Sequence, residues 1–188
     1  MLKHISLGTL AACTLAAVQV QAKESPAAPM PTAAAPAELS QYDFFLGNWN
    51  CTGKAFASPA GPEHATTAVV HAAKAVGGRW VHVTYDENKN AANPMPFHVG
   101  VYWGYEPAKK SFVQVCVDGA GGYCQQTSSG WNGDTFVFEG PGWSEGKQQT
   151  FRDTFTKKSA GTLTHSGGLL GENKQWVQLD EETCNKTK

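Results

Sequence analysis

Three histidines, His71, His82 and His98, lie on consecutive segments whose residues alternate in the manner of β-strands. A tight turn at Gly77-Gly78 would bring the first two onto one face of a hairpin, with the third on the next strand. Neutral imidazole nitrogens on adjacent strands can bind Zn²⁺ or Cu²⁺. Separate histidines, each hydrogen-bonded or hydrated, give the same pattern. We favour this second interpretation and assign no metal, keeping the three histidines as the candidate ligands.

A second pattern, Gly142-Trp143-Ser144-Glu145-Gly146, has the letters of the Gly-x-Ser-x-Gly elbow that carries the nucleophile of many hydrolases. The elbow needs a buried strand before the serine and a helix after it. Here Pro141 comes before the pattern, and residues 147–151 alternate like a strand. We therefore interpret the pattern as a surface turn and assign no catalytic residue.

Arg152 and Asp153 are neighbours in a segment predicted to be a strand, so their side chains point to opposite faces. One of the two must then face the interior or a partner strand. A charge buried without a partner is costly, so such a residue would need an opposite charge or a ligand. The other interpretation places the pair at the rim of the fold, and we favour it because charged residues are rarely fully buried.

The cysteines favour disulfides over a zinc site. Removal of a leader that contains Cys13 would leave Cys51, Cys116, Cys124 and Cys184, and four cysteines allow three pairings. Cys116 and Cys124 flank a turn-rich centre and would face each other across a hairpin, which leaves Cys51 to pair with Cys184. Their spacing lacks the close pairs that zinc sites use.

The N-terminal region predicts export. Residues 1–22 combine a basic start, a mostly apolar run and the small residues of a cleavage site at Val20-Gln21-Ala22, the pattern of a signal peptide. A lipoprotein anchored at Cys13 is the alternative, because the residues before it resemble a lipobox. Residues 23–38 are rich in alanine and proline and predict a disordered tether. Residues 39–188 then form one domain, in a periplasmic or extracellular location.

The segments after residue 46 have the short length and spacing of an antiparallel all-β fold. Strands are expected at about 47–56, 65–76, 79–86, 97–105, 111–117, 123–128, 134–139, 148–157, 161–166 and 174–183. Turns are expected at Trp131-Asn132-Gly133-Asp134 and Ser166-Gly167-Gly168, and a short helix within residues 38–46 has Ser40 as its possible cap. We predict an up-and-down β-barrel of about ten strands with a short N-terminal helix, and a sandwich is the alternative.

Phe97, Val99, Val101, Trp103 and Tyr105 lie on one face of their predicted strand. If that face points inward, the barrel has an aromatic lumen with a few amides, a suitable lining for a small ligand. The opposite orientation, or a filled core, fits the same alternation. The candidate ligand-binding residues are Phe97, Val101, Trp103, Phe112, Gln114, Phe136 and Phe151.

Composition excludes some partners. Lys and Arg number 15 against 16 Asp and Glu, so the net charge is −1 and no basic stripe indicates nucleic-acid binding. The longest apolar run, in the predicted leader, is shorter than the ~20 residues that span a bilayer, so no membrane-spanning helix is expected.

The opening of the domain, Phe45-Leu46-Gly47-Asn48-Trp49, resembles the first strand of calycin-superfamily barrels. Gly104-Tyr105-Glu106-Pro107, then Lys110-Ser111-Phe112, then Ser129 to Asp134 resemble a bacterial secreted, lipocalin-like branch of unknown function. This resemblance covers nearly all of Leu39 to Glu182. It implies an up-and-down barrel and, by analogy, ligand binding in the lumen.

The haem-binding nitrobindins are a cousin family that opens with Gly-x-Trp-x-Gly-x-Gly. Gly47, Trp49 and Gly53 fit that pattern, whereas Cys51 replaces its middle glycine. The resemblance would make His165 the axial ligand of the iron. Because of Cys51 and its expected disulfide, we assign no haem.

Three functional hypotheses follow. The first is an exported barrel, linked by disulfides, that binds a small, partly apolar molecule. The second is an isomerase or hydrolase that uses the lumen with His82 or His98 as its base. The third is a barrel with a filled core that serves as a structural or interaction protein of the cell envelope.

Overall fold

The computed structural model describes residues 34–58 and 61–187. The predicted signal peptide and most of the predicted tether lie outside these residues. A 3-10 helix, η1, begins at Ala37, two residues before the predicted start of the domain. None of the helices in the described part of the chain is long and apolar enough to cross a membrane.

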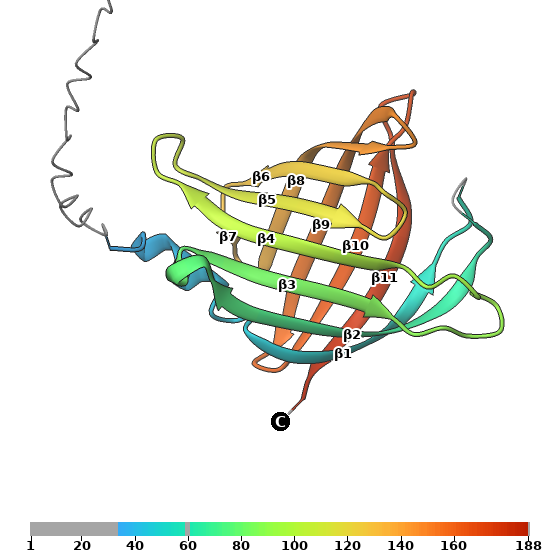
Figure 1. The fold of residues 1–188 in the computed structure, drawn as a ribbon, viewed down its shortest axis with the longest axis horizontal. Helices are drawn as coiled ribbons and strands as arrows, with labels where there is room; N and C mark the ends of the chain where they lie inside the picture. The colour runs from blue at the N-terminus through green and yellow to red at the C-terminus, as the bar shows by residue number, and fades with distance from the viewer. Residues whose placement is uncertain (1–33, 59–60, 188) are drawn as a thin grey trace, which may run out of the picture. The chain divides into compact units, whose positions relative to one another are not determined.

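Antiparallel strands form the rest of the fold (Figure 1). They are β1 (Gly47–Ala55), β2 (His64–Ala75), β3 (Trp80–Glu87), β4 (His98–Glu106), β5 (Ser111–Asp118), β6 (Tyr123–Ser128), β7 (Trp131–Asn132), β8 (Thr135–Ser144), β9 (Lys147–Ser159), β10 (Thr162–Leu170) and β11 (Trp176–Lys186). A second short helix, η2 (Val76–Gly78), joins β2 to β3.

The sheet closes on itself. Its strand order is β6-β5-β4-β3-β2-β1-β11-β10-β9-β8-β7, and an additional pairing of β6 with β8 joins the two ends. The two-residue β7 pairs with the start of β8, so the other ten strands make the wall. This confirms the predicted ten-stranded antiparallel barrel and excludes the sandwich.

The predicted short N-terminal helix is present as a 3-10 helix that ends at Tyr42. Ser40 is not its cap, because the Ser40 hydroxyl donates within the helix to the Ala37 carbonyl oxygen (2.8 Å). Ser166-Gly167-Gly168 is not a turn but part of β10, with a bulge between the two glycines. β8 continues through Ser144, so the turn expected at Gly142–Gly146 is reduced to Glu145 and Gly146, at φ 51° and 74°.

Aromatic side chains fill the end of the barrel next to η1. Tyr42 of η1 is fully buried, and its hydroxyl donates to the Gly104 carbonyl oxygen (3.1 Å). Its ring stacks on Trp103 at 5.5 Å and meets Phe112 edge-on at 5.3 Å. Such pairs stabilise by about 0.5–1.5 kcal/mol each beyond the area that they bury. Phe45, Phe136 and Phe138 complete this plug.

Two disulfides link strands on the inner face of the wall. Cys51 of β1 lies opposite Cys184 of β11 and is bonded to it, and Cys116 of β5 is bonded to Cys124 of β6. The first joins residues 133 positions apart in the chain, the second residues 8 positions apart. Disulfides persist in oxidising compartments, so the fold belongs in one.

The two disulfides should contribute unequally to stability. Loop-closure entropy predicts that Cys51→Ala/Cys184→Ala lowers the free energy of unfolding by about 5 kcal/mol, and Cys116→Ala/Cys124→Ala by about 2.5 kcal/mol. Guanidinium unfolding of both double variants measures the difference. Because the substitutions are chemically identical, the second variant is the control for the first. Equal losses would show that chain connectivity does not set their contributions.

Candidate ligand-binding site

A histidine on the inner face of the wall lies between two carboxylates from the strands on either side of it. His165 of β10 has Nε2 3.2 Å from Asp153 Oδ1 of β9, and Nδ1 3.2 Å from Asp180 Oδ1 of β11. The three side chains face the interior, yet 19%, 27% and 32% of their surfaces are exposed, in the order His165, Asp153, Asp180. Solvent therefore reaches the inner face of the wall at this layer.

Gly167 makes this arrangement possible. It lies between Asp153 on β9 and Asp180 on β11, two residues from His165 on the same face. Its N–H donates to Asp180 Oδ1 (3.0 Å), and a Cβ at this position would collide with Asp180 Oδ2. The missing side chain leaves room for the Asp180 carboxylate to lean over β10 toward the imidazole.

The two carboxylates keep the imidazole charged. Burial alone would lower the pKa of His165, but its hydrogen bonds to Asp153 and Asp180 outweigh burial and raise the pKa well above 6.5. Burial would likewise raise the pKa of Asp180, and the bonds from His165 and the Gly167 N–H instead bring it below 3.8. At neutral pH the group is an imidazolium between two carboxylates.

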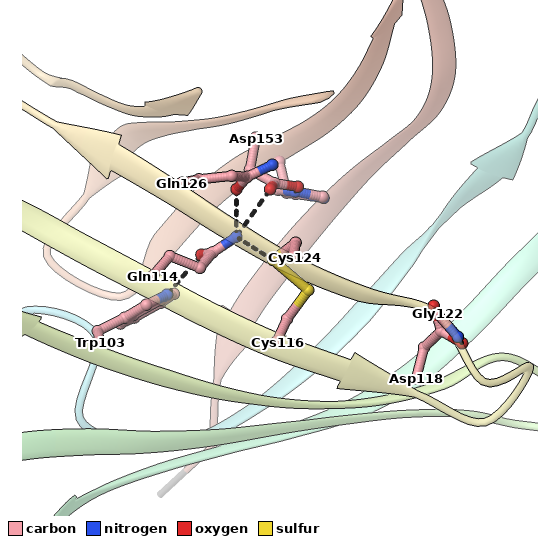
Figure 2. The surroundings of a disulfide bond; sticks show 9 residues. Trp103, Gln114, Cys116, Asp118, Gly122, Cys124, Gln126 and Asp153 are labelled. Carbon is pink, nitrogen blue, oxygen red and sulfur yellow. Dashed lines mark hydrogen bonds and ion pairs between the residues drawn. A yellow bond between two sulfur atoms is a disulfide. The ribbon is translucent and has the colours of Figure 1, made fainter. Parts of the chain in front are cut away.

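Amides connect this group to the aromatic plug (Figure 2). Gln114 Nε2 donates to Asp153 Oδ2 (2.9 Å) and to Gln126 Oε1 (2.5 Å). Trp103 Nε1 in turn donates to Gln114 Oε1 (2.6 Å). Gln114 and Gln126 are 4% and 1% exposed, so the amides form a fully buried floor beneath the hydrated layer.

A third carboxylate, Glu182, lies directly opposite His165 on β11. Its Oε1 accepts hydrogen bonds from the hydroxyls of Thr66 and Tyr85, each at 2.8 Å. The side chain reaches Thr66 by crossing β1 at Gly53, where a Cβ would lie 2.8 Å from Glu182 Cγ. Burial, and then the charge of Glu182, raise the pKa of the Tyr85 hydroxyl, which stays protonated and donating.

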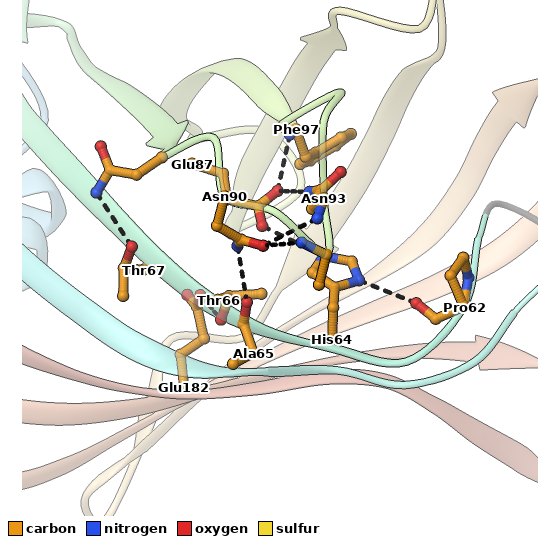
Figure 3. Close-up of polar contacts among 12 residues, drawn as sticks. Pro62, His64, Ala65, Thr66, Thr67, Glu87, Asn90, Asn93, Phe97 and Glu182 are labelled. Atoms are coloured by element: carbon orange, nitrogen blue, oxygen red, sulfur yellow. Dashed lines mark hydrogen bonds and ion pairs between the residues drawn. The ribbon is translucent and has the colours of Figure 1, made fainter.

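A fourth carboxylate, Glu87, anchors the loop at the far mouth (Figure 3). Its Oε2 accepts from Asn93 Nδ2 and from the backbone N–H of Phe97, each at 2.8 Å, and its Oε1 lies 3.3 Å from His64 Nε2. These bonds fix the segment 88–97 between β3 and β4. The Phe97 ring is then 46% exposed at the mouth, 6.3 Å from the ring of Tyr85.

The structure places five of the seven predicted lining residues inside the barrel and buried: Val101, Trp103, Phe112, Gln114 and Phe136. Four of them belong to the plug and the amide floor rather than to the hydrated half. Phe97 lies at the mouth. Phe151 is half-buried on β9, and its ring covers Gly142, where a Cβ would approach it to 2.7 Å.

The three candidate metal ligands are not brought together. They lie on the outer face of the wall, and each has a different partner. His71 Nδ1 is 2.6 Å from Asn48 Oδ1, His82 stacks on Tyr102 at 4.6 Å, and His98 Nδ1 is 3.0 Å from Asp86 Oδ1. Among the described residues, Cys51, Glu182 and Cys184 form a cluster of ligand type, but the disulfide occupies both sulfurs.

Two hollows of about 220 Å³ each open on the surface at the plugged end. One lies between η1 and Trp80, and the other surrounds Lys157. Neither contains a residue of the carboxylate layer. Asp153, His165 and Asp180 lie away from both hollows, and their side chains are 27%, 19% and 32% exposed.

Sequence reasoning missed Asp180 and Glu182 and placed Asp153 at the rim. A signal for two of them was present, because Asp180, Glu182 and Cys184 alternate along one strand and so share a face. A cysteine expected to pair inside the wall carries both carboxylates inside with it. Asp153 similarly shares its face with Phe151 and Phe155.

Comparison with known proteins agrees with the barrel. A family model described as "Protein of unknown function (DUF1579)" matches residues 39–186. The chain belongs to this family. The crystal structure of Rv2717c from M. tuberculosis is similar, with a TM-score of 0.64 and 14% identity over 82% of this chain and 100% of that chain, a likeness of fold alone. No curated protein matches the sequence. The structural match agrees with the closed antiparallel barrel described above.

Haem, which the nitrobindin resemblance implies, does not fit the residues around His165. An axial histidine needs a nitrogen lone pair directed at the iron. Both nitrogens of His165 lie 3.2 Å from carboxylate oxygens, which occupy the space beside the ring edge, and the raised pKa of the ring favours protonation of both nitrogens. The histidine therefore serves as a fixed positive charge.

The ionised group predicts a specific pH dependence of stability. The raised pKa of His165 contributes stability that is complete below 6.5 and is lost as pH rises through its folded-state value. The lowered pKa of Asp180 contributes stability that is complete above 3.8 and is lost in acid. Within that window, His165→Gln should lower the free energy of unfolding by about 2–3 kcal/mol.

Urea unfolding across the pH range tests this. The difference between wild type and His165→Gln should shrink on the alkaline side. His71→Gln, which removes a ring that contacts an amide on the outer face, is the control and should give only a small difference. A difference for His165→Gln that stays constant into alkali would contradict the ion triad.

Gly167→Ala should separate Asp180 from the imidazole, because the new methyl group occupies the space of Asp180 Oδ2. We expect the pKa of His165 to fall toward 6.5 and the protein to lose about 1–3 kcal/mol of stability. NMR titration of the His165 ring protons measures the pKa. Gly168→Ala is the matched control, since a Cβ there lies 3.4 Å from the Trp176 ring, an ordinary contact. The same titration curve for both variants would refute the role of Gly167.

Proposed function

We propose that this protein is an exported barrel that binds a small, partly apolar ligand in its interior, between the amide floor and the far mouth. One observation carries the proposal: Asp153, His165 and Asp180 face inward and are nevertheless 19–32% exposed. A packed core does not leave inward-facing charges accessible to water. The η1 end is filled, so entry is from the opposite end.

The walls of this half suit a partly apolar guest. Val99, Tyr85, Phe151 and Phe97 supply apolar and aromatic surface toward the mouth, and the carboxylate layer supplies a small number of fixed polar groups. Ligand sites in proteins combine these two elements, with the polar groups fixing the orientation of the ligand. The hydrogen bonds of Glu87 fix the loop that borders this mouth.

Export is supported by both disulfides, since such bonds persist in oxidising compartments. The leader expected over residues 1–22 agrees with this compartment. The enzyme hypothesis receives no comparable support, because His82 and His98, its candidate bases, lie on the outer face of the wall. A barrel of the cell envelope that works through its surface is the competing outcome of the experiment below.

Blocking the interior should abolish binding. N-phenyl-1-naphthylamine, a neutral apolar fluorophore, should bind the wild-type protein with increased fluorescence. Val99→Trp places a large ring in the open half and should weaken binding by about tenfold or more, the effect expected when an indole excludes the probe.

Val117→Trp is the matched control, because Val117 is 61% exposed on the outer face of the neighbouring strand. This variant should bind the probe as the wild type does. Loss of binding in Val117→Trp alone would place the site on the outer surface. Absence of binding to the wild-type protein would favour the filled, structural barrel.

A further inference from the structure

The polar layer has an excess of negative charge. Asp153, Asp180 and Glu182 face the interior with one cation, His165, between them. Two other cations of β9 are engaged elsewhere. Arg152 binds Glu139 on the outer face (2.7 Å), and Lys157 lies over the ring of Trp131 at the plugged end (3.6 Å). Inside a low-dielectric wall, such an excess produces a strong negative potential.

Two carboxylate oxygens of this layer have no protein donor. Both hydroxyl donors to Glu182 approach Oε1, and both N–H donors to Asp180 approach Oδ1. Within residues 34–58 and 61–187, every fully buried polar side-chain atom has a hydrogen-bond partner. Glu182 Oε2, which has no protein donor, is therefore not completely buried, although the residue as a whole is only 5% exposed.

We propose that the ligand carries a positively charged nitrogen, an ammonium or amidinium group, which donates to Glu182 and Asp180 while its apolar body extends along Tyr85 and Phe97 toward the mouth. This inference rests on the proposed interior site and adds the chemical class of its ligand. The two carboxylates are two residues apart on the same face of β11, so one nitrogen with several N–H groups can reach both.

The same arrangement disfavours a carboxylate ligand. The charged donor of the layer, His165, has both N–H groups committed to Asp153 and Asp180. An anion would then meet acceptor oxygens without a free charged donor, and like charges at close range repel. A neutral alcohol could donate one hydrogen bond but would leave the excess charge in place.

Three probes with the same alkyl chain separate these cases: octylammonium, 1-octanol and octanoate, measured by calorimetry at neutral pH on the full protein. Octylammonium should bind about tenfold or more tightly than the other two, because a charge-assisted hydrogen bond adds to the burial that all three share. Octanol or octanoate binding as tightly as octylammonium would overturn the charge inference and leave the interior site standing.

Glu182→Gln identifies the group responsible. The amide keeps an oxygen for Thr66 and Tyr85 but removes the charge, so the preference for octylammonium should fall by about tenfold while octanol binding is unchanged. Glu181→Gln is the matched control, since Glu181 is exposed on the outer face and makes the same change in net charge. Equal effects of the two substitutions would overturn the assignment.

Failure of the two proposals can be distinguished. If the naphthylamine probe binds and is blocked by Val99→Trp but octylammonium does not bind, the charge inference alone is wrong. If neither binds, both proposals are wrong. If Glu182→Gln lacks the near-ultraviolet circular dichroism of a folded barrel, the ranking of the three probes on the wild-type protein alone tests whether the ligand is positively charged.

Discussion

The pairing of β1 with β11 is the constraint on which the rest of the structure depends. It joins the first strand of the domain to the last and, together with the pairing of β6 with β8, closes the ten-stranded sheet into a barrel. The Cys51–Cys184 disulfide holds the two strands in one register. Side chains alternate with a period of two, so a slip of one residue would turn Glu182 and Asp180 to the outer face. The bond that closes the wall therefore also keeps the carboxylates inside.

Within that wall the η1 end and the opposite end of the barrel differ in composition. The rings of Tyr42, Trp103 and Phe136 fill the η1 end and supply the apolar burial from which a domain of this size gains most of its stability. Charged groups at the same place would be desolvated at a high cost. Beyond Gln114 the side chains of Asp153, His165 and Asp180 are partly exposed, so their ion pairs carry a smaller desolvation cost. The amide floor lies between these regions, and Gln114 is hydrogen-bonded to Trp103 of the plug on one side and to Asp153 of the charged layer on the other.

Much of the fold could be predicted from the sequence, because alternation over short segments and the cysteine spacing determine strands and closure directly. Turn-forming residues predicted the positions of turns less well. Ser166-Gly167-Gly168 has the residues of a turn, yet the glycines stay in β10, where the missing side chain admits a carboxylate from the next strand. Glycine frees the backbone for a turn and also frees space beside a strand, and local sequence does not distinguish the two uses.

The site was harder to predict than the fold because it depends on the stagger between strands. Alternation gives the face of Asp153, of His165 and of Asp180 separately. These side chains meet only if β9, β10 and β11 are aligned so that both aspartates lie beside Gly167. From there, both aspartates point toward His165 on β10. That alignment is set by the shear of the closed barrel, a property of all ten strands together.

The histidine in this layer changes the chemistry of its neighbours. A neutral imidazole would offer a lone pair to a metal or to haem iron, and the barrel would then be built around that group. With a carboxylate at each nitrogen, the ring instead neutralises part of the charge of Asp153 and Asp180 and fixes their positions. Glu182, opposite the ring, is hydrogen-bonded through Oε1 to Thr66 and Tyr85, and its Oε2 has no protein donor. The ion triad thus leaves Asp180 Oδ2 and Glu182 Oε2 as the two carboxylate oxygens of this layer without a protein donor.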